Sequence, residues 1–289
     1  SRRGPLPDGG DVRSRLARAA VLALGAVVLV VLALGVGYVA PDRPLIALAV
    51  AGGVLLLGVL AAEPAAVSLA AMPVLVIAHR VSAGGFDLSY SDAALIAATL
   101  AALVFAPRPF SPALRNLLWL NALYQFATLF TVVMNPYRAN VIEWFHAWTL
   151  VSGALLVGWT AGRRGHARLA LNLLLAACLA IAGLAIVQGA WQWAHGDLSP
   201  LYISWPVGMH KNLVGCILGF AAITAYARPH WLRWSTTQGF AAFAVFSVGL
   251  LFTQSRQAIL ALGVALLYVA FRDGRQRRRW TITLFAVVP

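Results

Sequence analysis

The chain of 289 residues is too apolar to fold as a soluble domain. Hydrophobic residues make up 61% of it, charged residues 11%, and the mean hydropathy is +0.81, whereas an average soluble domain is about 45–50% apolar and about 25% charged. The formal net charge of +13 comes almost entirely from arginines in short segments between apolar runs. This charge therefore indicates orientation in a membrane rather than binding to nucleic acid. The predicted fold is an all-α, polytopic transmembrane helix bundle.

Residues 1–18 form a polar, arginine-rich tail that is expected in the cytoplasm, and residues 19–289 form the transmembrane helical domain. Apolar runs of about this length cross a hydrocarbon core of about 30 Å as helices. The eleven predicted spans are about 19–39, 44–62, 64–79, 92–106, 113–134, 141–161, 167–190, 212–227, 237–252, 255–271 and 280–289. The first is interpreted as a retained signal anchor. The last stops at the chain end, so the domain is expected to be incomplete there.

Few local signals refine these boundaries. Ser91-Asp92 is interpreted as a helix N-cap, and Asn140 precedes another expected helix start. Cys178 and Cys216 fall inside apolar runs and are predicted to be small buried side chains rather than a disulfide or a metal pair. The sequence contains no Cys/His metal spacing, no P-loop and no dinucleotide-binding glycine motif, so no cofactor is predicted.

The positive charges support one orientation. With the N-terminus in the cytoplasm and the spans alternating, 17 of the 22 Lys and Arg residues fall in inner segments, as the positive-inside rule requires. The five outer cations are Arg43, Arg80, Arg138, Lys211 and Arg256. All but Arg43 lie at span ends. A single such cation can simply extend to the lipid headgroups, but four on one face favour a functional site.

Two of these cations begin helices. Lys211-Asn212 opens the eighth span and Ser255-Arg256 opens the tenth. Both spans run inward, so both helix N-termini, with their free N–H groups and partial positive charge, face the outer side. A cation there is unfavourable for the helix itself. The placement suggests a bound anion such as phosphate or pyrophosphate; the alternative is two unrelated interfacial cations.

The outer loop over about 191–211 contains Trp191, Trp193, Tyr202 and Trp205. Aromatic side chains at this depth are interfacial anchors or stack on sugar rings, and the sequence does not separate the two. His195 and Asp197 in the same loop are a weak signal for a catalytic pair.

Acidic residues are informative because none of the nine falls at the middle of a span. A proton-coupled transporter usually needs an acid there. Glu143 is the one acid at the outer end of a span that can enter a site, one turn from His146 and near Arg138. It is interpreted first as an ion-paired structural residue and second as a general base.

Three segments resemble the O-antigen ligase and polysaccharide polymerase superfamily (Wzy-C type). Residues 79–92, HRVSAGGFDLSYSD, resemble the outer loop of that family that contains Arg and ends in a Ser-Asp helix start. Residues 208–215, GMHKNLVG, resemble its Gly-x-x-His-Lys-Asn or Gly-x-x-x-Pro-Asn helix start, with one residue fewer after the Gly. Residues 253–258, TQSRQA, resemble its Thr-x-Ser-Arg-x-Ala helix start. The order, spacing and common membrane side of the three motifs make the match more specific than any one alone, and it covers most of 19–289.

The resemblance implies a multi-pass enzyme of the bacterial inner membrane with its site on the outer, periplasmic face. Such enzymes move a glycan from a polyprenyl pyrophosphate carrier to a hydroxyl of a glycan or lipid acceptor, without ATP or an essential metal. By position, Arg256 and Lys211 would hold the pyrophosphate, and His210 is a possible base. The implied substrate-binding residues are Arg80, Arg138, Asn212, Gln254, Ser255 and Trp205.

Two departures from the family pattern stand out. Members often carry an Arg just before the Gly of the second motif, where this chain has Trp205-Pro206-Val207. Members also have a long, His-containing outer loop after the spans found here, in the region where this chain stops. The alternative function is a transporter or flippase for a lipid-linked or amphiphilic substrate, which predicts internal repeats and deep polar groups. A non-catalytic scaffold would leave the outer cations unexplained.

Overall fold

The computed structural model describes residues 51, 55, 58–59, 62–63, 65–83, 86–105, 108–203 and 207–272, with the backbone alone at 81–83, 86–88 and 138–139. The chain divides into two units, Ser1–Glu63 and Pro64–Pro289, and everything below concerns the second. The spans predicted at 19–39 and 280–289 lie outside the described residues, and only isolated positions of 44–62 lie within them.

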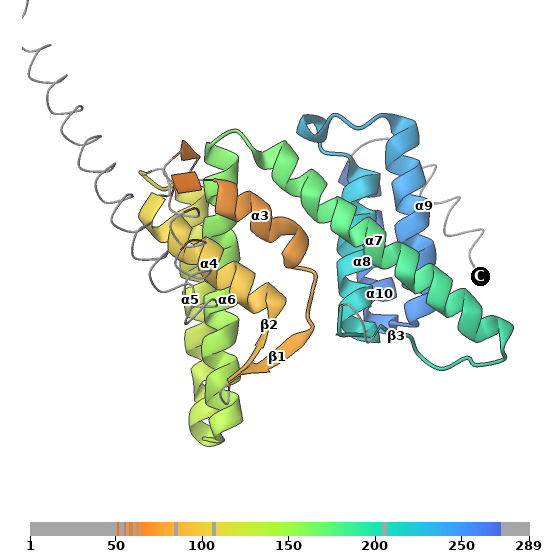
Figure 1. Cartoon of the computed structure of the whole chain (residues 1–289), viewed down its shortest axis with the longest axis horizontal. Coiled ribbons are helices and arrows are strands. Elements are labelled where there is room, and N and C mark those ends of the chain that lie inside the picture. The colour runs from red at the N-terminus through yellow and green to blue at the C-terminus, as the bar shows by residue number, and fades with distance from the viewer. Residues whose placement is uncertain are drawn as a thin grey trace, which may run out of the picture. The chain divides into compact units, whose positions relative to one another are not determined.

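The second unit is built almost entirely from helices (Figure 1). They are α3 (Ala66–Val74), α4 (Tyr90–Phe105), α5 (Pro112–Met134), α6 (Arg138–Arg163), α7 (Ala167–Ala194), α8 (Lys211–Ala227), the short 3-10 helix η1 (His230–Leu232), α9 (Thr236–Thr253) and α10 (Arg256–Arg272). Four of them, α5, α6, α7 and α9, are long and apolar enough to cross a membrane. The predicted all-α class is therefore confirmed for the described residues. The four long apolar helices are compatible with a membrane protein.

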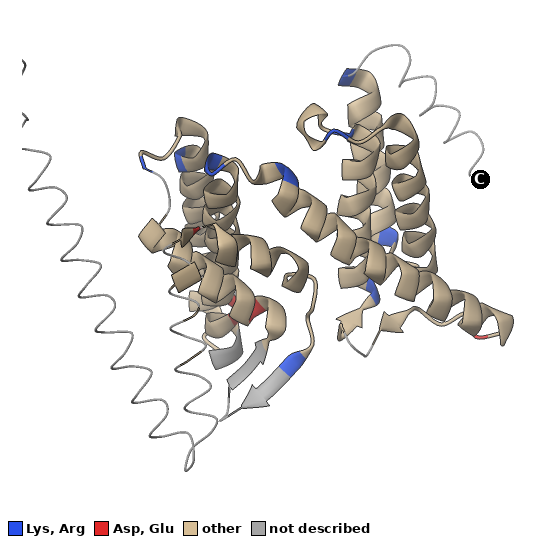
Figure 2. Ribbon diagram, turned by 45° about the horizontal axis from the view of Figure 1, so that its top comes forward, with Lys and Arg blue, Asp and Glu red and all other residues tan. Residues whose placement is uncertain are grey.

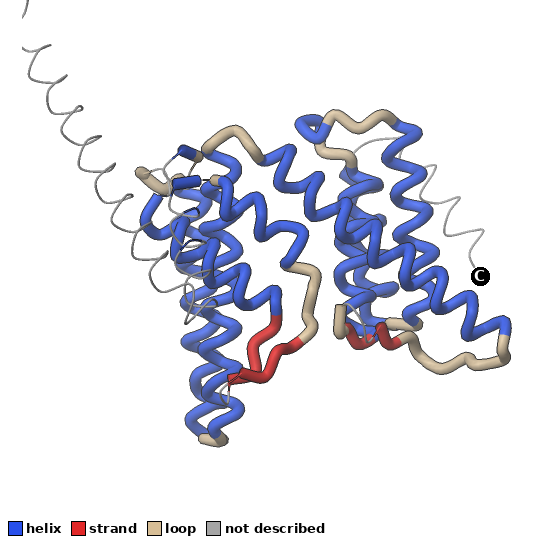
Figure 3. The backbone as a smooth tube through the Cα atoms, viewed as in Figure 1, coloured by secondary structure: helices blue, strands red, loops and turns tan. Residues whose placement is uncertain are grey.

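Two short antiparallel ribbons interrupt the helices. Strand β1 (Arg80–Ala83) pairs with β2 (Phe86–Ser89), and β3 (Tyr202–Ile203) pairs with β4 (Met209–His210). Figure 3 shows both ribbons at the lower end of the helices. The first ribbon leads into α4 and the second into α8, so each ribbon positions the start of a helix.

The third predicted span, 64–79, is shorter than expected. Its helix α3 has only nine residues, about 14 Å, against the roughly 30 Å of a hydrocarbon core. The apolar residues after it leave the helix because the start of α4 pairs with them. The N–H of Ser91 donates to Ile77 O at 3.0 Å, and the N–H of Tyr90 donates to His79 O at 3.1 Å.

Two expected helix starts are corrected. Helix α4 is capped by Ser89 rather than by Ser91-Asp92: Ser89 Oγ accepts from the N–H of Asp92 at 3.1 Å, and Asp92 Oδ2 accepts from the N–H of Ser89 at 3.1 Å. This reciprocal pair is a capping box. Helix α6 already begins at Arg138, so Asn140 lies inside it, where its side chain donates to Asn135 O at 3.0 Å.

Helix packing relies on small residues. Ala182 and Ala185 of α7 and Ala221, Ala222 and Ala225 of α8 are all 0% exposed. Side chains of this size let helix backbones approach closely, which is how helices associate in lipid, where burying larger apolar groups brings little gain. The prediction that Cys178 is buried is confirmed, whereas Cys216 is exposed on α8.

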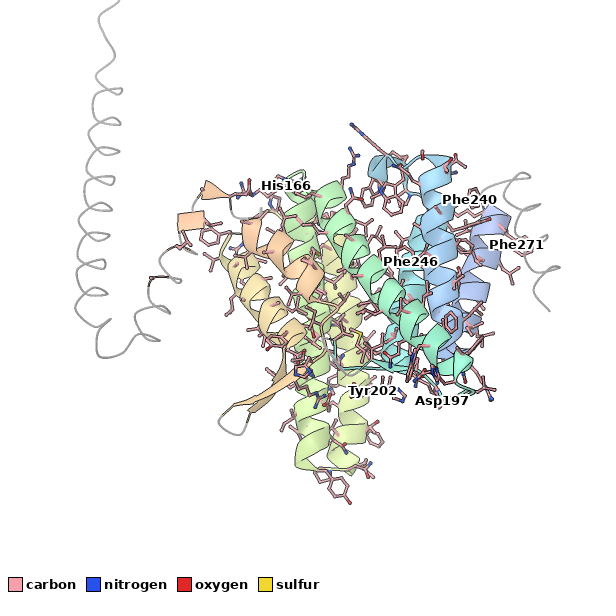
Figure 4. The ribbon with its side chains drawn as sticks, turned by 45° about the vertical axis from the view of Figure 1, so that its right-hand side comes forward. His166, Asp197, Tyr202, Phe240, Phe246 and Phe271 are labelled. Carbon is pink, nitrogen blue, oxygen red and sulfur yellow. The ribbon has the colours of Figure 1, made fainter. Side chains whose placement is uncertain are left out.

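The larger side chains form two cores. One lies among α7, α8 and α9 and includes Leu218, Leu250 and Phe246, which is labelled in Figure 4. The other lies among α3, α4 and α6 and includes Val157. Leu174 of α7 packs against both cores, so α7 joins the two halves of the unit.

The cations gather mainly at one end of this unit (Figure 2). Arg163 and Arg168 lie at the turn between α6 and α7, and Arg228 follows α8. The loop after α8 meets the start of α7, because Trp234 Nε1 donates to Asn172 Oδ1 at 3.1 Å. Lys211 and Arg256 begin α8 and α10 at the other end. These two groups of cations thus lie at opposite ends of the helices.

Candidate functional site

The start of α8 is held by the second ribbon. Tyr202 pairs with His210 across the ribbon, and Ile203 pairs with Met209. Ile203 and Met209 are each 1% exposed, so one face of the ribbon belongs to the core while Tyr202 and His210 are exposed on the other. His210 is the N-cap of α8, and its Nδ1 accepts from the N–H of Asn212 at 3.4 Å. Lys211, the first residue of α8, is half-buried, and Asn212 is exposed.

The start of α10 is a tight corner after α9. Thr253 and Ser255 are buried, and Thr253 Oγ1 accepts from the N–H of Ser255 at 3.2 Å while donating to Leu250 O at 2.6 Å. Gln254 between them has a left-handed φ of 54°, which is unfavourable for a residue with a side chain. Its Nε2 donates to Leu198 O at 2.9 Å, which ties the corner to the loop before β3. Arg256 follows as the exposed first residue of α10.

These two helix starts touch each other. Ser255 Oγ donates to Asn212 Oδ1 at 3.4 Å, between residues 43 positions apart. A Cβ at Gly215, one turn into α8, would lie 2.6 Å from Ser255 Cβ and 3.1 Å from Ala258 Cβ. Only glycine allows this approach. The N-termini of α8 and α10 therefore lie side by side, and each carries a cation.

The segment that contains Arg80 packs against the residues just before α8. Gly208, just before β4, has a φ of +61°, and a Cβ there would lie 2.7 Å from Cα of His79. The ring of His79 stacks on Tyr90 with centroids 6.1 Å apart. Arg80 follows as the exposed first residue of β1. The three segments that carry the family resemblance therefore meet at one end of the helices.

Such an arrangement is suited to an anion. Two helix N-termini present free N–H groups and a partial positive charge, and Lys211 and Arg256 add two full charges at the same level. Phosphate groups bind well to this combination because they accept several charge-assisted hydrogen bonds at once. Within the described residues, no group of three or more His, Cys, Asp or Glu side chains could hold a metal ion.

The structure does not describe the side chains of two predicted substrate-binding residues. Arg138 begins α6, but only its backbone is described. Trp205 lies outside the described residues. Of the others, Asn212, Gln254 and Ser255 make the contacts given above, and these contacts join the helix starts to one another and to the loop before β3.

Polar side chains in the loop after α7 have partners in that loop or at the end of α7. His195 Nδ1 lies 2.8 Å from Trp191 O, and the two rings are 4.4 Å apart. Asp197 Oδ1 accepts from the N–H of Ser199 at 2.8 Å; hydrogen bonds from Ser199 lower the pKa of the Asp197 carboxyl. His195 and Asp197 thus each have a partner nearby in the sequence. Asp197 and Tyr202 lie at the same end of the helices (Figure 4).

One polar contact between α4 and α6 was not predicted from the sequence. His146 Nε2 of α6 lies 3.0 Å from Asp92 Oδ1 of α4, although the geometry is not that of an aligned hydrogen bond. His146 Nδ1 lies 3.6 Å from Glu143 Oε2. Glu143 is therefore ion-paired when His146 is protonated, in line with its first interpretation. Asp92 and His146 are distant in the sequence, and no local pattern links them.

A comparison of the chain with family models, with curated proteins and with solved structures finds no match. The resemblance to the O-antigen ligase and polymerase superfamily therefore remains a hypothesis based on the three motifs.

Proposed function

We propose that this chain belongs to an integral membrane enzyme that transfers a glycan from a polyprenyl pyrophosphate carrier to an acceptor hydroxyl. The observation that supports it best is the contact between Asn212 and Ser255, which brings together two helix N-termini that begin with Lys211 and Arg256. Arg80, on the segment packed against Gly208, would border the same site. The acceptor is a glycan or a lipid, and its identity distinguishes a polymerase from a ligase.

The proposed reaction places its developing charge at this site. The acceptor oxygen attacks the anomeric carbon, the bond from that carbon to the pyrophosphate oxygen breaks, and the pyrophosphate leaves with the electron pair. Fixed cations and helix N-termini near the leaving group stabilise this charge without having to reorganise. The proton of the acceptor hydroxyl passes to a base. His210 is the candidate within this chain, because it is exposed beside Lys211.

Lys211→Ala is expected to lower glycan transfer by about 100-fold or more, because one fixed charge at the leaving group is lost. The measurement is transfer of glycan from a polyprenyl pyrophosphate donor by purified full-length protein. Lys211→Arg should retain part of the rate because it keeps the charge. Arg164→Ala, which removes an exposed cation after the C-terminus of α6, should have no effect. Undiminished transfer by Lys211→Ala would count against the pyrophosphate site.

The proposed site faces the outside of an inner membrane, with the N-terminus in the cytoplasm. In cells whose protein lacks the exposed thiol (Cys216→Ala), we expect His195→Cys to react with a membrane-impermeant maleimide from outside. Gln276→Cys should react only after the membrane is opened. His195 is exposed in the loop after α7, at the proposed outer end, whereas position 276 lies in an arginine-rich segment expected inside. The reverse labelling pattern would overturn the orientation.

A further inference from the structure

An apolar groove runs along α10 where this helix packs against α8. It consists of two adjoining cavities of about 410 Å³ and about 710 Å³. Both are lined by Ile223 of α8 and by Gln257, Ala261 and Ala265 of α10, so they form one continuous depression. It extends from Gln257 to Val269, a distance of about 18 Å along a helix.

Small side chains create the groove. Ala258, Ala261 and Ala265 recur at helical spacing on α10, and Gly219 faces them from α8. A Cβ at Gly219 would lie 3.6 Å from Ala258 O, an ordinary van der Waals distance, so the two helices are less tightly packed there than at Gly215. The side chains lining the groove are hydrocarbon apart from Gln257, Cys216 and Tyr268. An apolar ligand therefore fits its length.

The groove begins one residue after Arg256, which does not itself line it. Gln257 lines both cavities and directly follows Arg256. Lys211 begins the neighbouring helix at the same end, where Ser255 contacts Asn212. A molecule that matches both features has an anionic head and a long apolar tail.

A second apolar cavity lies between α5 and α6, away from α8 and α10. It has a volume of about 450 Å³ and is lined by Trp119, Phe126, Trp144 and Trp148 together with aliphatic side chains and Gln125. Like the groove, it has no charged lining residue. It is therefore the internal control for an apolar hollow that neither α8 nor α10 lines.

From the groove and the two helix-start cations near its Gln257 end, we infer that the isoprenoid chain of the donor lies in the groove between α8 and α10, with its pyrophosphate at Lys211 and Arg256. The inference rests on the proposed function for the identity of the donor. The protein then binds its carrier by both parts: the cations hold the head, and the groove selects a tail that is long enough to fill it. Specificity for a long carrier would come from α10 rather than from the polar site.

The test uses full-length protein in lipid nanodiscs and a polyprenyl pyrophosphate with a photoreactive group on its tail. We expect the label on peptides of α8 and α10, and competition by unlabelled polyprenyl pyrophosphate. Ala261→Trp, which fills the groove, should reduce this labelling at least about tenfold, because each buried methylene contributes roughly fourfold to an association constant. Ala122→Trp, in the α5–α6 cavity, should leave it unchanged. A pyrophosphate with only two isoprene units should bind Ala261→Trp and the unmodified protein equally.

Three results would overturn the inference. Competition by phosphatidylglycerol as strong as that by polyprenyl pyrophosphate would make the groove a site for bulk lipid. A disulfide formed in high yield between Ala265→Cys and a cysteine placed within 280–289 would show the groove to be covered by the chain itself. The third such result is labelling that Ala261→Trp leaves unchanged. Photolabelling does not require glycan transfer, so it tests the groove separately from the proposed function. The transfer rates of the Lys211 and Arg256 variants test the proposed function.

Discussion

Arg256→Ala is expected to lower glycan transfer by about 100- to 1000-fold while leaving the protein folded. Removing one preorganised group that stabilises charge in a transition state costs about 2.7–4 kcal/mol in activation free energy. Arg256 is exposed on the first turn of α10, where a cation opposes the helix dipole by about 0.3–1 kcal/mol. Its removal should therefore keep or slightly raise the melting temperature. Activity and stability are expected to move in opposite directions, as they do for a group placed for function.

The measurements are the transfer rate and the melting temperature of purified full-length protein in the same detergent. Arg256→Lys should recover part of the rate, because it keeps the charge but loses the planar guanidinium that binds phosphate with two hydrogen bonds. Arg168→Ala, at the start of α7 and the opposite end of the helices, is the control and should match the unmodified protein. If Arg256→Ala transferred glycan at the normal rate, the pyrophosphate assignment would fail.

Gly215→Val is expected to abolish transfer and to lower stability together. A Cβ at this position would lie 2.6 Å from Ser255 Cβ and 2.9 Å from Ser255 Oγ, so α8 and α10 have to separate. Overpacking of this kind costs about 1–3 kcal/mol in stability. It would also break the contact between Asn212 and Ser255, and the two cations would lose their common position. The change touches no charged residue, so it tests the geometry alone.

Two companion variants make this result specific. Gly183→Val in α7 introduces the same side chain where a Cβ meets nothing within 4 Å, so it carries only the small helix-propensity change and should retain transfer. Ser255→Gly combined with Gly215→Val removes the two closest clashing atoms and should restore part of the lost melting temperature. Normal transfer by Gly215→Val would show that the approach of the two helices is unimportant for the reaction.

Much of the helical layout could be predicted because it depends on local composition. The spans expected at 113–134, 212–227 and 237–252 correspond to α5 (Pro112–Met134), α8 (Lys211–Ala227) and α9 (Thr236–Thr253). Long apolar runs bounded by polar residues can only satisfy their backbone groups in an apolar setting as helices. The positions of Lys211 and Arg256 at helix starts followed from the same pattern.

The sequence did not predict local structure or contacts that depend on residues distant in the chain. Residues 75–79 were expected to continue a helix. They are non-helical because Ile77 and His79 accept hydrogen bonds from the start of α4. The pair of Asp92 and His146 depends on the packing of α4 against α6, which no local pattern encodes.

The sequence by itself determined the class of the fold, the helix starts that carry cations and the separation of most cations to one end of the helices, because each follows from composition and from the order of apolar runs and polar segments. The tertiary structure alone decided the contacts within the candidate site. The approach of Gly208 to His79 and of Gly215 to Ser255 requires specific backbones to pack without a Cβ between them. Glycine is found in many helices and turns, so only the packed structure distinguishes the two that hold the site together.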